Sequence, residues 1–301
     1  MEIVELGTGV FHLRAGSNMG LVVRDGRGLL IDAGLDRDAS RKALRIAEEM
    51  GVALEAILLT HAHADHFGGA HFLQKRLQVS LYAPELEAAM MENPIVEPLY
   101  LFGGAAPIGE LRHKFTLAKP CRIDHVVQPG ALEIGSFRVE VLSLPGHALG
   151  QVGFALDGVL FCADAVFPEE TLEKHKLIFN VDLDETLKTL EMLPELEYAV
   201  FAPGHGPAYS AGDEIQRICA ANSQRLEEVR EQVYQALDEP RETSDILARV
   251  AKHFGLAVKN VTAYLLTQVP ILAALSALER AGRIDTVVEN NVLTWQRTHA
   301  A

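Results

Sequence analysis

The chain has 301 residues, of which 49% are hydrophobic and 23% are charged, so its composition excludes long disordered segments, collagen-like repeats and coiled-coil rods. A prior of roughly 100–200 residues per domain predicts two domains. The 41 acidic residues outnumber the 27 basic ones and give a formal net charge of −14. This balance disfavours a general binder of nucleic acid or anionic membranes, because neutralising phosphate requires clustered Lys and Arg.

The sequence predicts a cytoplasmic protein. It contains no run of about 18 uninterrupted apolar residues that would indicate a membrane span. Residues 1–20 lack the basic and apolar segments of a signal peptide, so we expect none. Cys121, Cys162 and Cys219 are odd in number and far apart, which favours free thiols in a reducing compartment over a disulfide framework. We expect Cys162 to pack in the core, with proximity to a metal as the alternative.

Strand-like and helix-like segments alternate through the first part of the chain. Short aliphatic segments separated by glycines predict a meander of strands, and amphipathic spacing that ends at Gly51 predicts the first helix. The predicted strands are 10–16, 19–26, 28–34, 56–60 and 79–83, and the predicted helices are 37–50 and 67–77.

Residues 85–120 break this alternation, because Met, Pro, Gly and aromatic residues occur there without a steady period. We predict an insertion with one or two short helices, which either covers a pocket or packs as a surface subdomain. Strand-like segments then return, and the Asp157–Gly158 pair predicts a hairpin. The later strands are expected over 125–130, 137–144, 151–156, 159–164 and 198–203, with a helix over 182–193.

From about residue 213 the pattern becomes helical. Three amphipathic segments are followed by two short strands around 289–291, and helices with a terminal hairpin resemble a winged-helix module. We therefore expect a first domain over 1–212 and a C-terminal domain over 213–301. The predicted elements of the second domain are helices over 213–237, within 240–255 and within 269–282, and a pair of strands within 283–296.

The strongest local signal is the motif HAHADH at 61–66, which places four metal-capable side chains directly after a buried strand. Imidazole and carboxylate groups are ligands for zinc, iron and manganese. Three further candidates, His147, Asp164 and His205, each follow an apolar strand at a turn of small residues. Strand ends on one side of a sheet are where α/β folds collect active sites, so we expect these side chains to meet.

The motifs HAHADH, PGHALGQ, CAD and PGHG, in that order, together with the early segment LLIDAG, resemble the metallo-β-lactamase superfamily over roughly residues 1–210. The resemblance implies an α+β fold, a four-layer αβ/βα sandwich with a binuclear metal site along one edge and Asp32 buried behind it. To this sandwich the chain adds its winged-helix-like module. The implied ligands are His61, His63 and His147 for one metal ion, Asp65, His66 and His205 for a second, and Asp164 as a bridge.

The resemblance also implies how such a site would work. Two divalent cations would lower the pKa of a bridging water toward 7 and give a hydroxide nucleophile. We expect these cations to be Zn²⁺, with Mn²⁺ or Fe²⁺ as alternatives. Asp65 would orient the nucleophile and help pass its proton. The basic segment Lys174, His175 and Lys176 either contacts the substrate or forms a solvated loop. Gln151 stands where several subfamilies have His or Ser, so no subfamily follows from it.

We therefore expect a metal-dependent hydrolase of a small ester, thioester or lactone-like substrate. One alternative is a ribonuclease or phosphodiesterase of the same fold, because some relatives with a winged module cleave RNA. Residues 213–301 carry 10 basic and 12 acidic residues, so the module lacks the overall charge of a nucleic-acid binder, although a local basic patch stays compatible.

A further alternative is a mononuclear iron persulfide dioxygenase, with one iron on His61, His63 and His147. The complete second ligand set argues against this alternative. A non-enzymatic role is also open for the C-terminal module, as an element for homodimerisation or for binding another partner. The long helix over 213–237 has room for a partner face, although a helix packed within the fold is the default expectation. We expect a small-molecule substrate and no membrane partner.

Overall fold

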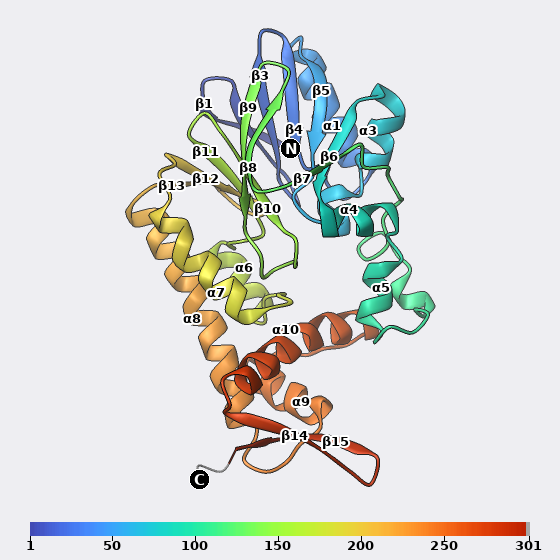
Figure 1. Ribbon diagram of the computed structural model, residues 1–301, viewed down its shortest axis with the longest axis vertical. Coiled ribbons are helices and arrows are strands. Elements are labelled where there is room, and N and C mark those ends of the chain that lie inside the picture. The colour runs from blue at the N-terminus through green and yellow to red at the C-terminus, as the bar shows by residue number, and fades with distance from the viewer. Residues whose placement is uncertain (299–301) are drawn as a thin grey trace.

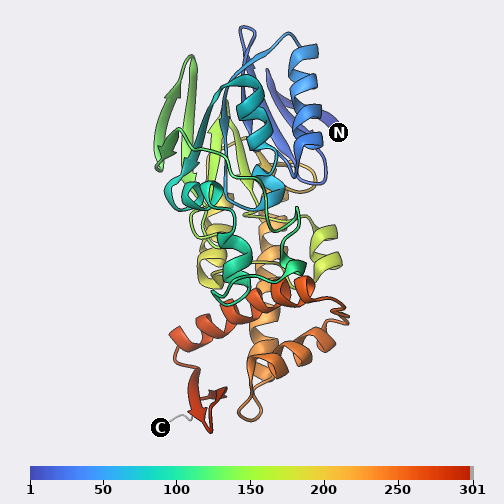
Figure 2. The same cartoon turned by 90° about the vertical axis from the view of Figure 1, so that its right-hand side faces the viewer.

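The computed structural model describes residues 1–298. Two β-sheets lie face to face, helices cover the outer side of each sheet, and a helical region with a terminal hairpin lies at one end of this sandwich (Figures 1 and 2). The structure therefore confirms the predicted α+β class and the four-layer arrangement.

The first sheet contains seven strands in chain order. Its first four strands form an antiparallel meander, whereas the later ones pair in parallel through helical crossovers. The strand β1 was not predicted, because its largely exposed edge position leaves a weak hydrophobic pattern. The strands are β1 (Glu2–Gly7), β2 (Val10–Arg14), β3 (Met19–Arg24), β4 (Arg27–Ile31), β5 (Ala53–Leu58), β6 (Ser80–Pro84) and β7 (His125–Val127).

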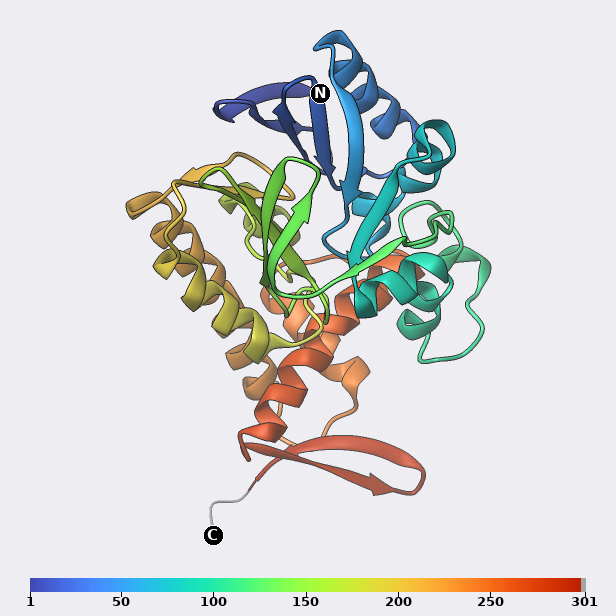
Figure 3. The same ribbon diagram turned by 45° about the horizontal axis from the view of Figure 1, so that its top comes forward.

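The second sheet contains six strands in the order β13-β12-β11-β10-β9-β8. The predicted hairpin is present, and Asp157 and Gly158 both have positive φ angles, +52° and +79°, as a tight two-residue hairpin turn requires. Figure 3 shows the two sheets as separate layers. The strands are β8 (Gly130–Ile134), β9 (Phe137–Ser143), β10 (Val152–Leu156), β11 (Val159–Ala163), β12 (Val200–Pro203) and β13 (Tyr209–Ser210).

Apolar side chains hold the four layers together. Leu29 and Leu58 of the first sheet pack in one cluster with Phe154 and Phe161 of the second, and burying each such side chain stabilises the fold by roughly 1.5–3 kcal/mol. Helices α1 (Arg37–Glu49) and α3 (Ala70–Leu77) cover the first sheet. Helices α7 (Leu183–Met192) and α8 (Asp213–Gln235) cover the second sheet.

The predicted insertion joins β6 to β7 and carries helices α4 and α5 and the short helix η1. Three other short helices lie beside strand ends or helix ends: α2 inside the His-rich motif, α6 after β11, and η2 after α7. Their bounds are α2 (Ala64–Phe67), α4 (Glu85–Glu92), α5 (Val96–Leu101), η1 (Gly109–Leu111), α6 (Glu169–His175) and η2 (Leu193–Glu195).

The C-terminal region grows out of α8. The first half of α8 packs on the second sheet through Ile215 and Ile218, and its second half packs through Val229 and Val233 on the last two helices. The order of helices followed by a hairpin is the predicted one, while the winged-helix character and the domain boundary at residue 212 stay predictions. The remaining elements are α9 (Thr243–His253), α10 (Val261–Arg280), β14 (Ile284–Glu289) and β15 (Val292–Arg297).

Helix α10 begins at Val261, well before the predicted start at residue 269. The prediction missed its first part because Thr, Gln and Pro270 interrupt the apolar pattern there. The Asn260 side chain accepts a 2.8 Å hydrogen bond from the backbone N–H of Ala263 and so caps the helix. By length and composition α10 is also long and apolar enough to cross a membrane, although here it packs against α8 and α9. The expectation that the chain has no membrane contact stays a prediction.

Hydrogen bonds join the two sheets near one edge. His12 Nε2 in β2 donates to the carbonyl oxygen of Pro203 at the end of β12, at 3.1 Å. His12 is only 1% exposed, and burial lowers the pKa of its imidazole from 6.5 to about 4. The folded protein thus keeps His12 neutral at a pH where the unfolded chain would protonate it.

His12 should therefore destabilise the fold as the pH falls from about 6.5 to 4, because in that range the unfolded state binds more protons. The His12→Gln variant keeps a donor for Pro203 but does not titrate. Between pH 6.5 and 4 its free energy of unfolding should therefore fall less than that of the unmodified protein, with a difference of up to about 3 kcal/mol. Urea unfolding at several pH values measures this difference. A His253→Gln control changes an exposed histidine, and equal pH dependence in all three proteins would contradict the prediction.

Candidate metal centre

The predicted ligands lie at the carboxyl ends of strands from both sheets. The motif at 61–66 follows β5, and His147 follows β9. Asp164 and His205 follow β11 and β12, which are parallel neighbours, so both side chains lie at the same edge of the second sheet. The fold thus brings together residues that are far apart in the sequence.

The ligand atoms form two trios with a shared carboxylate. The ligand atoms within each group lie within 4.8 Å of one another. Asp164 Oδ1 lies 3.3 Å from His66 Nε2, and its Oδ2 lies 3.5 Å from His147 Nε2 and 3.4 Å from His205 Nε2. Asp164 therefore lies between the trios. The groups are His61, His63 and His147; Asp65, His66 and His205; and Asp164 with His61 and His66.

Several polar atoms of this centre are buried without a hydrogen-bond partner. Among residues 1–298 these include His61 Nε2, His66 Nε2 and Asp164 Oδ1. A buried polar atom without a partner costs free energy, so such groups are normally hydrogen-bonded or bound to a metal. Imidazole nitrogens and carboxylate oxygens at this spacing are the donor set of divalent transition metals. The residues present thus fit a pair of divalent cations.

The two trios differ in charge. Burial and the neighbouring imidazoles lower the pKa of His61 well below its usual value and that of His63 to about 3, so these rings are neutral. Burial also opposes protonation of His66 and His205, but the surrounding carboxylates, chiefly Asp164 and with it Asp65, together outweigh burial. They raise the pKa of His66 well above its usual value and that of His205 to about 10. A cation at the second trio would replace this positive charge.

Asp32, expected behind the site, fixes the direction of one ligand. Its carboxylate accepts hydrogen bonds from the Thr60 backbone N–H at 2.9 Å and from His66 Nδ1 at 2.9 Å. The Nε2 atom of His66 then points toward Asp164. Carboxylate partners of this kind set the tautomer and orientation of metal-binding histidines.

Asn18 holds the loop that carries His205, and sequence reasoning missed it. Its side-chain amide donates to the carbonyl oxygens of Pro203 at 3.0 Å and Gly206 at 2.9 Å, and its backbone N–H donates to Gly204 at 2.7 Å. Only the folded chain places β3 beside this loop, so no local signal identifies Asn18. Ser17, its neighbour, donates a 2.7 Å hydrogen bond to the Asp65 carboxylate.

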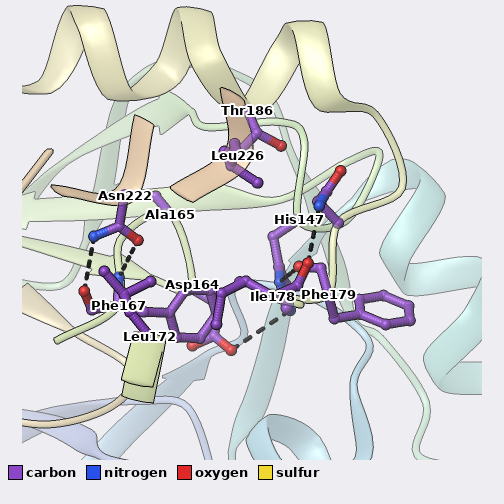
Figure 4. Close-up of a pocket in the computed structure, with 11 residues that line it drawn as sticks. His147, Asp164, Ala165, Phe167, Leu172, Ile178, Phe179, Thr186, Asn222 and Leu226 are labelled. Atoms are coloured by element: carbon purple, nitrogen blue, oxygen red, sulfur yellow. Dashed lines mark hydrogen bonds and ion pairs between the residues drawn. The ribbon is translucent and has the colours of Figure 1, made fainter. Parts of the chain in front are cut away.

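A second missed residue, Asn222 of α8, holds the segment that follows Asp164. Its side chain accepts from the backbone N–H of Phe167 at 3.0 Å and donates to its carbonyl oxygen at 2.8 Å (Figure 4). The Phe167 ring lies 6.0 Å from the His205 ring and 5.6 Å from the His147 ring. These residues, except His205, line a small cavity of about 10 Å³ that the ligands His147 and Asp164 also line. The C-terminal helical region therefore supports the metal site.

The metal ligands open onto a cleft of about 1050 Å³. Of the predicted substrate residues, Lys174 and His175 line this cleft, whereas Lys176 does not line it and pairs with the Glu173 carboxylate. Cys162 lies in the core cluster on the outer side of the second sheet, where burial raises the pKa of its thiol. A buried neutral thiol of this kind is unreactive.

Glu97 of α5 is a third residue that the sequence did not single out. It lines the cleft and is 7% exposed. Burial and the nearby Asp65 and Glu87 raise the pKa of its carboxyl well above the usual value. The cleft wall thus contains a carboxyl group that favours its neutral form. Glu97 lies in an insertion whose sequence has no regular hydrophobic period, so the sequence pattern did not identify it.

Comparison with known proteins agrees with this geometry. The sequence model of the metallo-beta-lactamase superfamily matches residues 13–205, so the chain belongs to this superfamily. The solved structure of the metallo-beta-lactamase family protein TTHA1429 from Thermus thermophilus has the same fold, with a TM-score of 0.75 and 22% identity over 98% of this chain and 100% of that one. A beta-lactamase domain protein from Burkholderia ambifaria also has a TM-score of 0.75, at 20% identity over 99% and 94%.

Curated relatives are hydrolases. A hydroxyacylglutathione hydrolase from Dechloromonas aromatica is 30% identical over 49% of this chain and 43% of its own length. The probable metallo-hydrolase YqgX from Bacillus subtilis is 29% identical over 64% of this chain and 85% of its own length. The chain thus spans less than half the length of that hydroxyacylglutathione hydrolase. Together with the fold and the ligand groups, these matches identify an enzyme of the metallohydrolase class.

Gly204 lies where a side chain would enter the metal centre. A Cβ atom there would lie 2.2 Å from Asp164 Oδ1 and 2.6 Å from His66 Cε1. The Gly204→Ala variant should therefore lose metal, because Asp164 or His66 must move. Elemental analysis of the purified protein measures this. Gly7→Ala is the control, since nothing lies within 4 Å of its added Cβ. Full metal content in Gly204→Ala would contradict the assigned geometry.

Asp32→Asn should weaken metal binding by about 10–100-fold, because the amide no longer favours the His66 tautomer that points Nε2 at the metal. Competition with a chromophoric chelator measures the affinity. Asp157→Asn, in the hairpin turn between β10 and β11, is a matched control far from the ligands. The prediction fails if both variants bind metal as the unmodified protein does.

Proposed function

We propose that the protein hydrolyses an ester or thioester of a small molecule with two divalent cations, for which Zn²⁺ is the first candidate. The observation that carries this proposal is the pair of ligand trios around Asp164, in which His61 Nε2, His66 Nε2 and Asp164 Oδ1 are buried without a hydrogen-bond partner. A site with nitrogen donors and three carboxylate or imidazole ligands per ion suits zinc. The name of the Dechloromonas aromatica relative, a hydrolase of a thioester class, supports the choice of reaction.

When bound, two such cations lower the pKa of water toward neutrality and polarise a carbonyl oxygen. The chain's own residues would then hold the reacting groups. Asp65 lines the cleft, and its carboxylate accepts a hydrogen bond from the Ser17 hydroxyl. In this proposal Asp65 would accept and return a proton. Lys174 and His175 line the same cleft and would contact the substrate. The free, buried cysteines suit a reducing compartment such as the cytoplasm.

Metal content and hydrolysis should be lost together in His61→Ala and His205→Ala. Each variant removes one member of a different trio, so each should lose about one metal ion per chain and nearly all hydrolysis of an acyl glutathione thioester or a nitrophenyl ester. His253→Ala changes an exposed histidine of α9 and should keep both properties.

The same experiment separates the alternatives. Preferential cleavage of a phosphodiester would replace the ester and thioester assignment. One iron per chain that His205→Ala retains would contradict the binuclear hydrolase altogether.

A further inference from the structure

We infer that the start of α10 forms one wall of the substrate cleft and that the substrate carries an extended aliphatic chain, which lies along this wall beside the scissile ester or thioester. This inference rests on the proposed hydrolase function and adds the class of substrate. It assigns a binding role to the C-terminal helix.

The position of α10 is the first observation. Ala263, Leu266 and Thr267 line the same cleft as the ligands His147 and Asp164. Its volume of about 1050 Å³ slightly exceeds the range of roughly 300–1,000 Å³ for pockets that enclose drug-sized ligands. A lactoyl or acetyl group alone would leave most of this space filled with water. The cleft therefore suits a substrate that reaches from the metal ligands to α10.

Apolar side chains from several elements line the cleft together with Leu266. Leu177, Ile178 and Phe179 come from the connection between α6 and α7, and Phe115 comes from the insertion. The Phe179 ring also lies 5.2 Å from the ring of the ligand His63, so the apolar lining reaches the metal centre. An aliphatic chain attached to a carbonyl at the metals would thus meet apolar surface.

Polar contacts fix α10 in this position. Thr262 Oγ1 donates a 2.8 Å hydrogen bond to the Glu110 carbonyl oxygen and lies 3.3 Å from His113 Nε2. The neighbouring Lys114 forms a 2.9 Å ion pair with Asp36, at the start of α1. The insertion therefore connects α10 to the first sheet's helical layer, and the start of α10 lies beside α5 (Figure 1). The wall is held in place before a ligand binds.

The composition of α10 is an independent observation. Its apolar composition would suit a fully buried helix, yet only 39% of its most apolar stretch of 18 residues is buried. Residues 262–269 are half-buried throughout. The helix thus keeps apolar surface that its own region does not cover, and Leu266 presents part of that surface to the cleft. Each methylene group buried there would raise kcat/KM by up to about fourfold.

The test uses the metal-loaded full chain and two homologous substrate series. One series lengthens the acyl chain of a nitrophenyl ester from acetyl to dodecanoyl, and the other lengthens the alkyl thiol of an acetyl thioester. We expect kcat/KM to rise with length in the acyl series. A rise in the thiol series alone would place the aliphatic chain on the leaving group and keep the cleft assignment.

Variants of α10 test whether the preference for long chains depends on the cleft wall that this helix forms. Leu266→Asp should lower kcat/KM for the dodecanoyl ester by about tenfold or more, and by much less for the acetyl ester. Ala263→Trp narrows the cleft and should also lower kcat/KM for the dodecanoyl ester more than for the acetyl ester. This second variant keeps the test decisive if Leu266→Asp fails to fold. Leu272→Asp is the control, because Leu272 is 40% exposed on the same helix and does not line the cleft.

The outcomes separate the two proposals. Hydrolysis that is independent of chain length, or of Leu266, would overturn the aliphatic cleft and leave the hydrolase function standing. If no ester or thioester is hydrolysed, the proposed function is wrong. Calorimetric titration with dodecanoate then tests separately whether the cleft binds an aliphatic chain. Binding of dodecanoate that Leu266→Asp weakens and Leu272→Asp does not would support the cleft, whereas no binding would reject it.

Discussion

The buried carboxylate of Asp164 is the group on which the rest of the site depends. Removing a charge from water costs several kcal/mol unless opposite charge surrounds it. The structure meets this requirement with the imidazoles of His66 and His205, at 3.3 and 3.4 Å, whose pKa values are raised. Ala163 turns the chain at a φ of +48°, and the missing side chain of Gly204 leaves room for the carboxylate. The backbone around the ends of β11 and β12 is thus shaped by one acidic group.

Most of the metal centre could be predicted from the sequence, because its ligands are few in type and each follows an apolar strand. The residues that hold those ligands could not. Asn18 and Asn222 act on chain segments 185 and 55 residues away, so nothing beside them in the sequence indicates their partners. Glu97 lies in an insertion without periodicity. A local pattern reports what a side chain is, whereas these roles depend on which segments the fold brings together.

The fold shows the same division. Strands with buried faces, such as β10 and β11, were predicted because their sequence is continuously apolar. The edge strands β1 and β13 are partly exposed or very short, and their pattern is correspondingly weak. Helix α10 extends further than predicted because contacts with α5, α8 and α9 stabilise a segment whose own periodicity is interrupted. Tertiary packing therefore decided the elements that local propensity left open.

The position of α10 has a consequence for how such an enzyme diverges. Every metal ligand lies within the first 205 residues, whereas part of the cleft wall comes from residues 263–267. Changes in this short stretch would alter which molecules enter without disturbing the reactive centre. Selection can thus act on substrate range and on chemistry almost independently. A substitution between residues 263 and 267 would therefore reshape the cleft wall and leave every ligand side chain in place.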